Sequence, residues 1–202
     1  MHNCIFSGHC TEDGACSVSC PILAQTSYLL ERNGISMSNP IFKLSQEEMD
    51  KYVNLLALSA GKLSSVLVSG GVMTNQAADA ITYCAICENW KGSKLHCVVY
   101  NLKFSQYIEA IQKSWSFTSD DSSSEYMKIW ATSAKVLIIS NIDFVNFKDF
   151  QCQTLLSLLQ SRINTDLTTI VVSPPVSSLV GEGQFFSRLT DMIKKQKVGE
   201  TI

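Results

Sequence analysis

The sequence predicts an α/β protein in which helices flank a parallel sheet, and three observations lead to this fold class. First, Val66-Leu67-Val68 is a short β-rich apolar run that passes through two glycines into a helix-favouring segment at 76–81. Second, residues 135–139 have the apolar pattern of a strand buried in the centre of a parallel sheet. Third, a helical pattern at 150–163 is followed by a strand pattern at 169–172, so that strands and helices alternate.

The remaining predicted elements continue this alternation. Asn33-Gly34 suits the end of a helix, and the run from Ser45 to Glu48 resembles a capping box that opens another. These elements are helices at 22–30, at 46–60 and around 107–111, a strand at 95–100, a solvated loop at 118–125 and a last edge strand at 197–202.

Composition indicates a foldable chain of ordinary domain size. Of the 202 residues, 46% are hydrophobic and 17% are charged, which is typical of a globular protein. No stretch approaches the ~20 apolar residues that a membrane helix needs, and the N-terminus lacks a secretory pattern. The net charge of −2 argues against a strong nucleic-acid binder, so nucleic-acid contact should be weak or indirect. We expect a cytoplasmic protein without a membrane contact.

The glycine turn has the layout of a phosphate-binding loop without its chemistry. The pattern G-x-x-x-x-G-K-[ST] aligns with residues 70–77 without a gap. It begins at Gly70 and Gly71, but its second glycine is replaced by Asn75, its lysine by Gln76 and its hydroxyl residue by Ala77. The lysine contacts the β- and γ-phosphates and the hydroxyl binds magnesium. We therefore predict a degenerate nucleotide loop at 70–77.

A second position of the same chemistry is also replaced. In ATPases with this loop, the later buried strand ends in an aspartate that helps to hold magnesium, and a glutamate often follows. Here the two positions are Ser140 and Asn141. Asp143 is a poor substitute because two residues of strand add about 6–7 Å.

The order of elements between residues 64 and 189 resembles the AAA+ core of bacterial helicase loaders of the DnaC/DnaI type. This resemblance implies a P-loop NTPase-like sheet with flanking helices, and the end of the chain soon after Arg188 implies that no C-terminal lid is present. It further implies a polar sensor region at Ser173-Pro174-Pro175 and an arginine-bearing segment around Arg188. Arg188 is the candidate for an arginine finger that acts in trans on the nucleotide of a neighbouring subunit, and Arg162 is the alternative.

Four of the eight cysteines lie within the first twenty residues and form the candidate metal site. They are Cys4, Cys10, Cys16 and Cys20. So short a segment cannot bury a core, and four thiolates around one zinc ion would provide the free energy that orders it. An iron–sulfur cluster is the main alternative, because Cys20-Pro21 resembles the end of ferredoxin cysteine runs. Disulfides or free thiols are the third possibility, and elemental analysis distinguishes zinc from iron.

The predicted organisation has three parts. Residues 1–34 form a cysteine-rich module with a helix, 35–62 a linker and helix, and 63–202 the degenerate AAA+ core. No catalytic residue and no ATP hydrolysis are expected. The resemblance implies a protein of bacterial or phage DNA replication that contacts a replicative helicase or an AAA+ partner, with a hetero-oligomer as one form of assembly.

Two other functions remain open. One is an inactive structural subunit of a clamp-loader-like assembly, in which a four-cysteine zinc module and an inactive loop also occur together. The other is a nucleotide-binding enzyme with an unorthodox loop, because the amides at a helix N-terminus attract phosphate even without a lysine.

Overall fold

The computed structural model describes residues 21–67, 71–89, 99–115, 122–142, 147–173, 188–189, 191–192 and 194–197. Its elements in chain order are α1 (Pro21–Arg32), η1 (Pro40–Lys43), α2 (Gln46–Ser59), β1 (Leu63–Leu67), α3 (Gly71–Asn89), β2 (Val99–Lys103), α4 (Phe104–Lys113), α5 (Ser122–Ser133), β3 (Val136–Ser140), α6 (Asp149–Asn164), β4 (Thr168–Ser173) and β5 (Lys194–Lys197).

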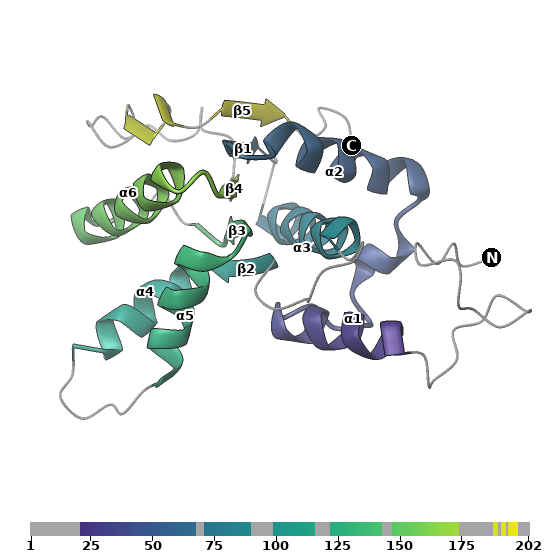
Figure 1. Cartoon of the computed structure of the whole chain (residues 1–202), viewed down its shortest axis with the longest axis horizontal. Coiled ribbons are helices and arrows are strands. Elements are labelled where there is room, and N and C mark those ends of the chain that lie inside the picture. Colours follow the sequence, from purple (N-terminus) through teal and green to yellow (C-terminus); the bar gives the residue numbers. More distant parts are fainter. Residues whose placement is uncertain are drawn as a thin grey trace, which may run out of the picture.

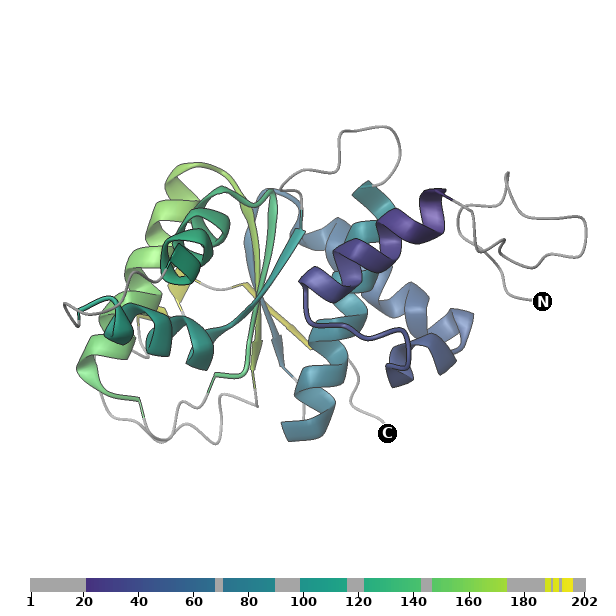
Figure 2. The ribbon, with the colours of Figure 1, turned by 90° about the horizontal axis from the view of Figure 1, so that it is seen from below.

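The five strands form one sheet in the order β2-β3-β4-β1-β5, and every pairing is parallel. Figure 1 shows the helices arranged around this sheet. Seen from below, α1, α2 and α3 cover one face, while α4, α5 and α6 cover the other (Figure 2). The predicted parallel α/β fold is therefore confirmed.

Each face of the sheet has its own apolar core. Val66, Ile138 and Ile170 point to the face covered by α3 and pack with Leu30 of α1. The alternate residues of the same strands, such as Ile139, point to the other face, where the α4, α5 and α6 side chains pack. This division follows from the two-residue period of a strand.

Some element boundaries differ from the sequence prediction. Residues 122–125, expected in a solvated loop, form the first turn of α5, a helix that the sequence analysis missed. A described edge strand, β5, lies at 194–197, and the strand predicted at 197–202 falls outside the described residues except for Lys197. The second strand, β2, extends to Lys103, three residues beyond the predicted end, while residues 95–98 of the prediction lie outside the described residues. No helix in the described part of the chain is long and apolar enough to cross a bilayer.

The end of α1 closes the outer edge of the sheet. Gly34 has φ +73°, its N–H bonds to Glu31 and the N–H of Ile35 bonds to Leu30, which is the paired arrangement expected of a glycine-ended helix. This turn presents Asn33 to the edge strand, and its Oδ1 accepts the Asn101 backbone N–H at 2.7 Å. An N–H that an edge strand would leave unpaired is thereby satisfied.

A polar network continues inward from this edge on the face covered by α3. The Asp79 carboxylate accepts from Asn39 Nδ2 at 2.8 Å and from Asn101 Nδ2 at 3.3 Å. The Asn101 side-chain oxygen in turn accepts the Ser140 hydroxyl at 3.0 Å. The network joins the segment before η1, helix α3 and strands β2 and β3. Burial raises the pKa of Asp79, and these hydrogen bonds and the Lys103 charge oppose that rise only in part.

Arg162 of α6 holds the opposite face together. It is fully buried, and its guanidinium donates to the Ala131 carbonyl at 3.0 Å and to the Ala134 carbonyl at 2.9 Å. It also donates to the carbonyl of Thr168 at 2.7 Å and to the Thr169 hydroxyl at 2.6 Å. Burial lowers the pKa of Arg162 to about 10, so the side chain stays charged at neutral pH. One side chain thus joins α6, the end of α5 and the start of β4.

We predict that Asp79 makes stability fall as the pH rises above about 4. Burial raises the pKa of Asp79 in the folded chain above its ordinary value, so over this range the folded state binds more protons than the unfolded state. Asp79→Asn removes this titration but keeps an acceptor oxygen. As the pH rises from 4 to 7, the urea midpoint of the wild type should fall relative to that of the Asp79→Asn protein. A constant difference between the two would contradict the prediction.

We predict that Arg162→Leu lowers the free energy of unfolding by about 3 kcal/mol, because it leaves buried carbonyls without donors. Arg162→Lys keeps the charge but loses the forked arrangement of N–H donors, so its free energy of unfolding should lie between those of the wild type and of Arg162→Leu. Urea unfolding followed by circular dichroism measures both changes. Arg188→Leu, at an exposed arginine, is the matched control and should change stability by less than about 0.5 kcal/mol. Wild-type stability of the Arg162→Leu protein would refute the assigned role.

Candidate functional site

The carboxyl ends of the strands meet along one edge of the sheet. Leu67 ends β1, Ser140 ends β3 and Ser173 ends β4, with Leu67 opposite Ser173 in the register. The chain leaves β1 toward the face of α3, whereas Leu189, which follows β4, packs into the core of the other face. Ligands of parallel α/β sheets bind where neighbouring connections diverge in this way. The edge between β1 and β4 is therefore the candidate functional site.

Helix α3 begins earlier than the sequence predicts. It starts at Gly71, so that Asn75 and Gln76 already lie in its second turn. The prediction of a loop extending over residues 71–75 is therefore wrong, and Gly70 lies outside the described residues. The physical reason is that Asn75 replaces the second glycine: without that flexible position the segment continues as a regular helix.

The side chains at this helix start cannot replace those of a phosphate-binding loop. Asn75 is exposed and uncharged, Gln76 is partly buried, and Ala77 is 2% exposed within the apolar core. None of them carries a positive charge for phosphate, and Ala77 has no oxygen for a metal ion. What the helix offers to an anion is its N-terminal backbone amides.

The end of β3 is likewise without a carboxylate. Ser140 is 2% exposed, and its hydroxyl is donated inward to Asn101. Asn141 follows with φ 55°, a left-handed conformation that asparagine tolerates, and its Nδ2 donates to Ser105 Oγ at 2.8 Å. Both side chains are thus engaged in internal hydrogen bonds. Asp143 lies outside the described residues.

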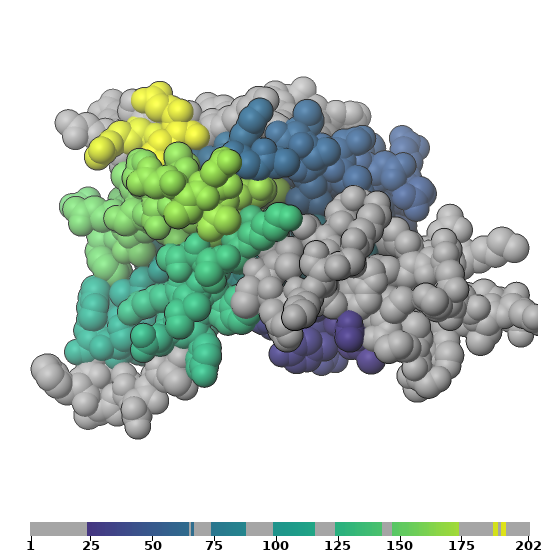
Figure 3. Space-filling view, in the orientation of Figure 1, coloured from purple at the N-terminus to yellow at the C-terminus, as the bar shows by residue number. Residues whose placement is uncertain are grey.

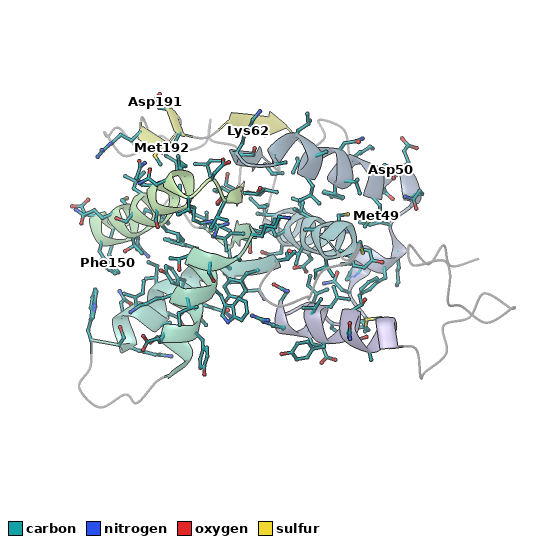
Figure 4. All side chains as sticks on the ribbon, in the orientation of Figure 1. Met49, Asp50, Lys62, Phe150, Asp191 and Met192 are labelled. Atoms are coloured by element: carbon teal, nitrogen blue, oxygen red, sulfur yellow. The ribbon has the colours of Figure 1, made fainter. Side chains whose placement is uncertain are left out.

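The two candidate arginines have different surroundings. Arg162 is buried and bonded to backbone carbonyls, so the prediction that it is an alternative finger is wrong. Arg188 is exposed. It lies three residues before Asp191, which lines a groove of about 400 Å³ together with Lys62, near the start of β1. Figure 4 shows Lys62 and Asp191 along the upper side of the molecule.

Arg188 therefore lies toward the amino edge of the sheet, away from the start of α3. Five residues of strand separate the two edges by roughly 16 Å. Within one chain Arg188 does not belong to the carboxyl-edge site.

The predicted metal ligands Cys4, Cys10, Cys16 and Cys20 lie outside the described residues. Within the described ranges no cluster of three or more His, Cys, Asp or Glu side chains could hold a metal ion. Cys84 and Cys87 of α3 are buried, and the Cys84 thiol donates to the Met49 carbonyl at 3.9 Å.

Three solved structures share this fold. The DnaC helicase loader superimposes with a TM-score of 0.51 at 15% identity, covering 85% of this chain and 99% of that one. The replication initiator DnaA bound to AMPPCP and single-stranded DNA gives 0.52 at 14% identity, over 73% of this chain. AMPPCP-bound DnaA from Aquifex aeolicus gives 0.50 at 14% identity, over 75% of this chain.

This chain covers 44% of each DnaA structure, which is less than half of their length. No protein-family model matches the sequence, and no curated protein does. At these identities the likeness concerns the fold. The chain therefore shares the parallel α/β fold of DnaA and of the DnaC helicase loader, in line with the resemblance seen in the sequence.

Proposed function

We propose that this protein acts in DNA replication as a non-hydrolysing relative of the helicase loaders, through contacts with other proteins. The observation that carries the proposal is the start of α3. Residues 71–75 are helical, and Gln76 and Ala77 align with the lysine and the hydroxyl residue of the phosphate-binding pattern.

Electrostatics support the loss of nucleotide chemistry. A Mg-triphosphate needs a cation on its β- and γ-oxygens and oxygen ligands for the metal. Helix amides alone contribute about 0.3–1 kcal/mol to the binding of an anion near the surface. Ser140 occupies the position of the second metal ligand, and its hydroxyl bonds to Asn101 instead.

The choice of a helicase as partner rests on the comparison of lengths. The DnaC helicase loader is matched over 99% of its chain, whereas each DnaA structure is matched over 44%. We infer that a replicative helicase or another AAA+ protein is the partner, in a bacterial or phage cytoplasm. The zinc module predicted at Cys4–Cys20, with an iron–sulfur cluster as its alternative, is the docking arm for this contact.

Calorimetric titration with Mg-ATP tests the loss of nucleotide binding. We expect no heat of binding up to about 1 mM nucleotide and no phosphate release. Micromolar, magnesium-dependent binding would instead establish the nucleotide-binding enzyme.

As the test of the partner, the full chain should co-elute with the purified hexameric helicase of its host. Association with a sliding-clamp loader in place of the helicase would support the structural-subunit alternative.

Arg188 is proposed as an arginine finger that reaches the nucleotide of an AAA+ neighbour. Its exposure and its position in the segment leading to β5 suit contact with another subunit. Arg188→Ala should lower ATP turnover by the assembled partner by roughly 10³-fold, the effect typical of such residues, without loss of co-elution. Lys135→Glu, another exposed charge, is the control. Equal turnover with the Arg188→Ala protein would exclude the finger.

A further inference from the structure

The inner face of α1 is half polar. Its buried side chains follow one another at helical spacing, and they are Thr26, Leu29, Leu30 and Asn33. The two leucines pack into the core beside α3. The Asn33 side-chain oxygen accepts the Asn101 N–H, but the buried Thr26 hydroxyl has no hydrogen-bond partner among the described residues. A buried polar atom without a partner weakens the contact that buries it.

Arg32 brings a second unpaired atom to the same helix. Its guanidinium carbon lies 3.4 Å from the centre of the Trp130 ring on α5, and this cation–π contact favours the docking of α1. Its Nη2 atom, however, is buried without an acceptor. Three buried side-chain nitrogen and oxygen atoms lack a partner in the described part of the chain, and two of them thus belong to α1. The helix is therefore held less firmly than its burial suggests.

Helix α3 is the contrasting element in the same core. Its residues in this core are apolar, and they are Ala77, Ala78, Ala80, Ile81, Ala85 and Ile86. Its buried Thr82 hydroxyl is satisfied, since it donates to the Ala78 carbonyl at 2.7 Å. Helix α3 has 19 residues, whereas α1 has 12. Isolated helices shorter than about 12–15 residues are marginal in water, so α1 should lose its helical structure when it leaves the core.

The chain after α1 provides a hinge and an anchor. Gly34 ends the helix with φ +73°, and residues 36–38 are exposed. Asn39 then donates to the Asp79 carboxylate at 2.8 Å, and Ile41 is 1% exposed. An opening of α1 can therefore stop at Asn39 without disturbing α2 or α3. Figures 1 and 3 show α1, in purple, at the lower margin of the molecule.

Asn101 connects α1 to the carboxyl edge of the sheet. Its N–H is bonded to Asn33 of α1, and its side-chain oxygen accepts the Ser140 hydroxyl at 3.0 Å. Ser140 ends β3 at the candidate functional site. Release of α1 would leave the Asn101 N–H without its acceptor. The position of Asn101, and with it the bond to Ser140, therefore depends on α1.

We propose that residues 21–35 form a releasable latch whose opening is coupled through Asn101 to the carboxyl edge of the sheet. The latch opens by local unfolding of α1 about residues 36–38, while the sheet and α3 stay folded. Because coupling between two sites is reciprocal, a change at either end shifts the equilibrium at the other. The latch lets a contact at the amino-terminal end of the chain act on the carboxyl-edge site, and it does not depend on the proposed function.

Amide hydrogen exchange of the full chain, followed by NMR, tests the latch. The hydrogen-bonded amides of α1 should share one protection factor, at least about 100-fold below that of α3. The Asn101 N–H, 68 residues after its acceptor Asn33, should exchange with α1 and not with β3. Because a local opening exposes little surface, these rates should stay nearly constant in low urea, whereas those of α3 rise.

Thr26→Val should strengthen the latch, because valine keeps the shape of threonine without the unpaired hydroxyl. We expect the exchange of the α1 amides and of the Asn101 N–H to slow by about tenfold. Thr82→Val is the matched control. It removes a buried hydroxyl that has a partner, so the exchange of α1 should not slow.

Ser140→Ala tests the coupling at the far end of the latch. It removes the hydrogen bond that holds the Asn101 side chain, so by reciprocity the exchange of α1 should become about fivefold faster. Ser133→Ala is the control, because Ser133 is exposed and donates to the Ile129 carbonyl of its own helix at 2.7 Å. The Ser133→Ala protein should exchange like the wild type.

Four outcomes would overturn the proposal. The first is protection of the α1 amides as strong as that of α3, which would mean that no local opening occurs. The second is an Asn101 N–H that stays protected while α1 exchanges. The third is unchanged or faster exchange of α1 in the Thr26→Val protein. The last is wild-type exchange of α1 in the Ser140→Ala protein, which would exclude the coupling.

Discussion

The guanidinium of Arg162 is the constraint on which the arrangement of one half of the molecule depends. It sits in a fully buried position where it meets backbone carbonyls and a hydroxyl instead of a carboxylate. A charged group in the interior is tolerated only if its donors are satisfied, so the end of α5 and the start of β4 must stay in place around it. Two of these carbonyls lie at the C-terminal end of α5, where the helix dipole also favours a cation.

The sequence predicts the core of this fold well because the central strands are continuous apolar runs. Residues 135–139 and 169–172 match β3 and β4 to within one residue at each end, and the capping box at Ser45 forms as expected. Helix α5 was missed because its first turn, Ser122-Ser123-Ser124-Glu125, reads as a polar loop. Its helical start is favoured by Glu125 in the first turn and by packing of its later residues, such as Ala131.

The strand and the helix at the carboxyl edge of the sheet, β1 and α3, were predictable from the sequence. The helical state of residues 71–75 was not, because an alignment to a loop pattern assumes the loop. The buried position of Arg162 could not be predicted from the sequence pattern either. An arginine in the last turn of a helix normally contacts solvent, and here the packing of α5 against α6 buries it. The polar network around Asp79 joins four distant segments, and nothing in local spacing predicts such a meeting.

The outer edge of β2 has a consequence for how this protein can associate. The amide oxygen of Asn33 occupies the place that the carbonyl of an added strand would take. Extension of the backbone ladder from chain to chain is therefore unfavourable at this edge, because a new strand would first have to displace the end of α1.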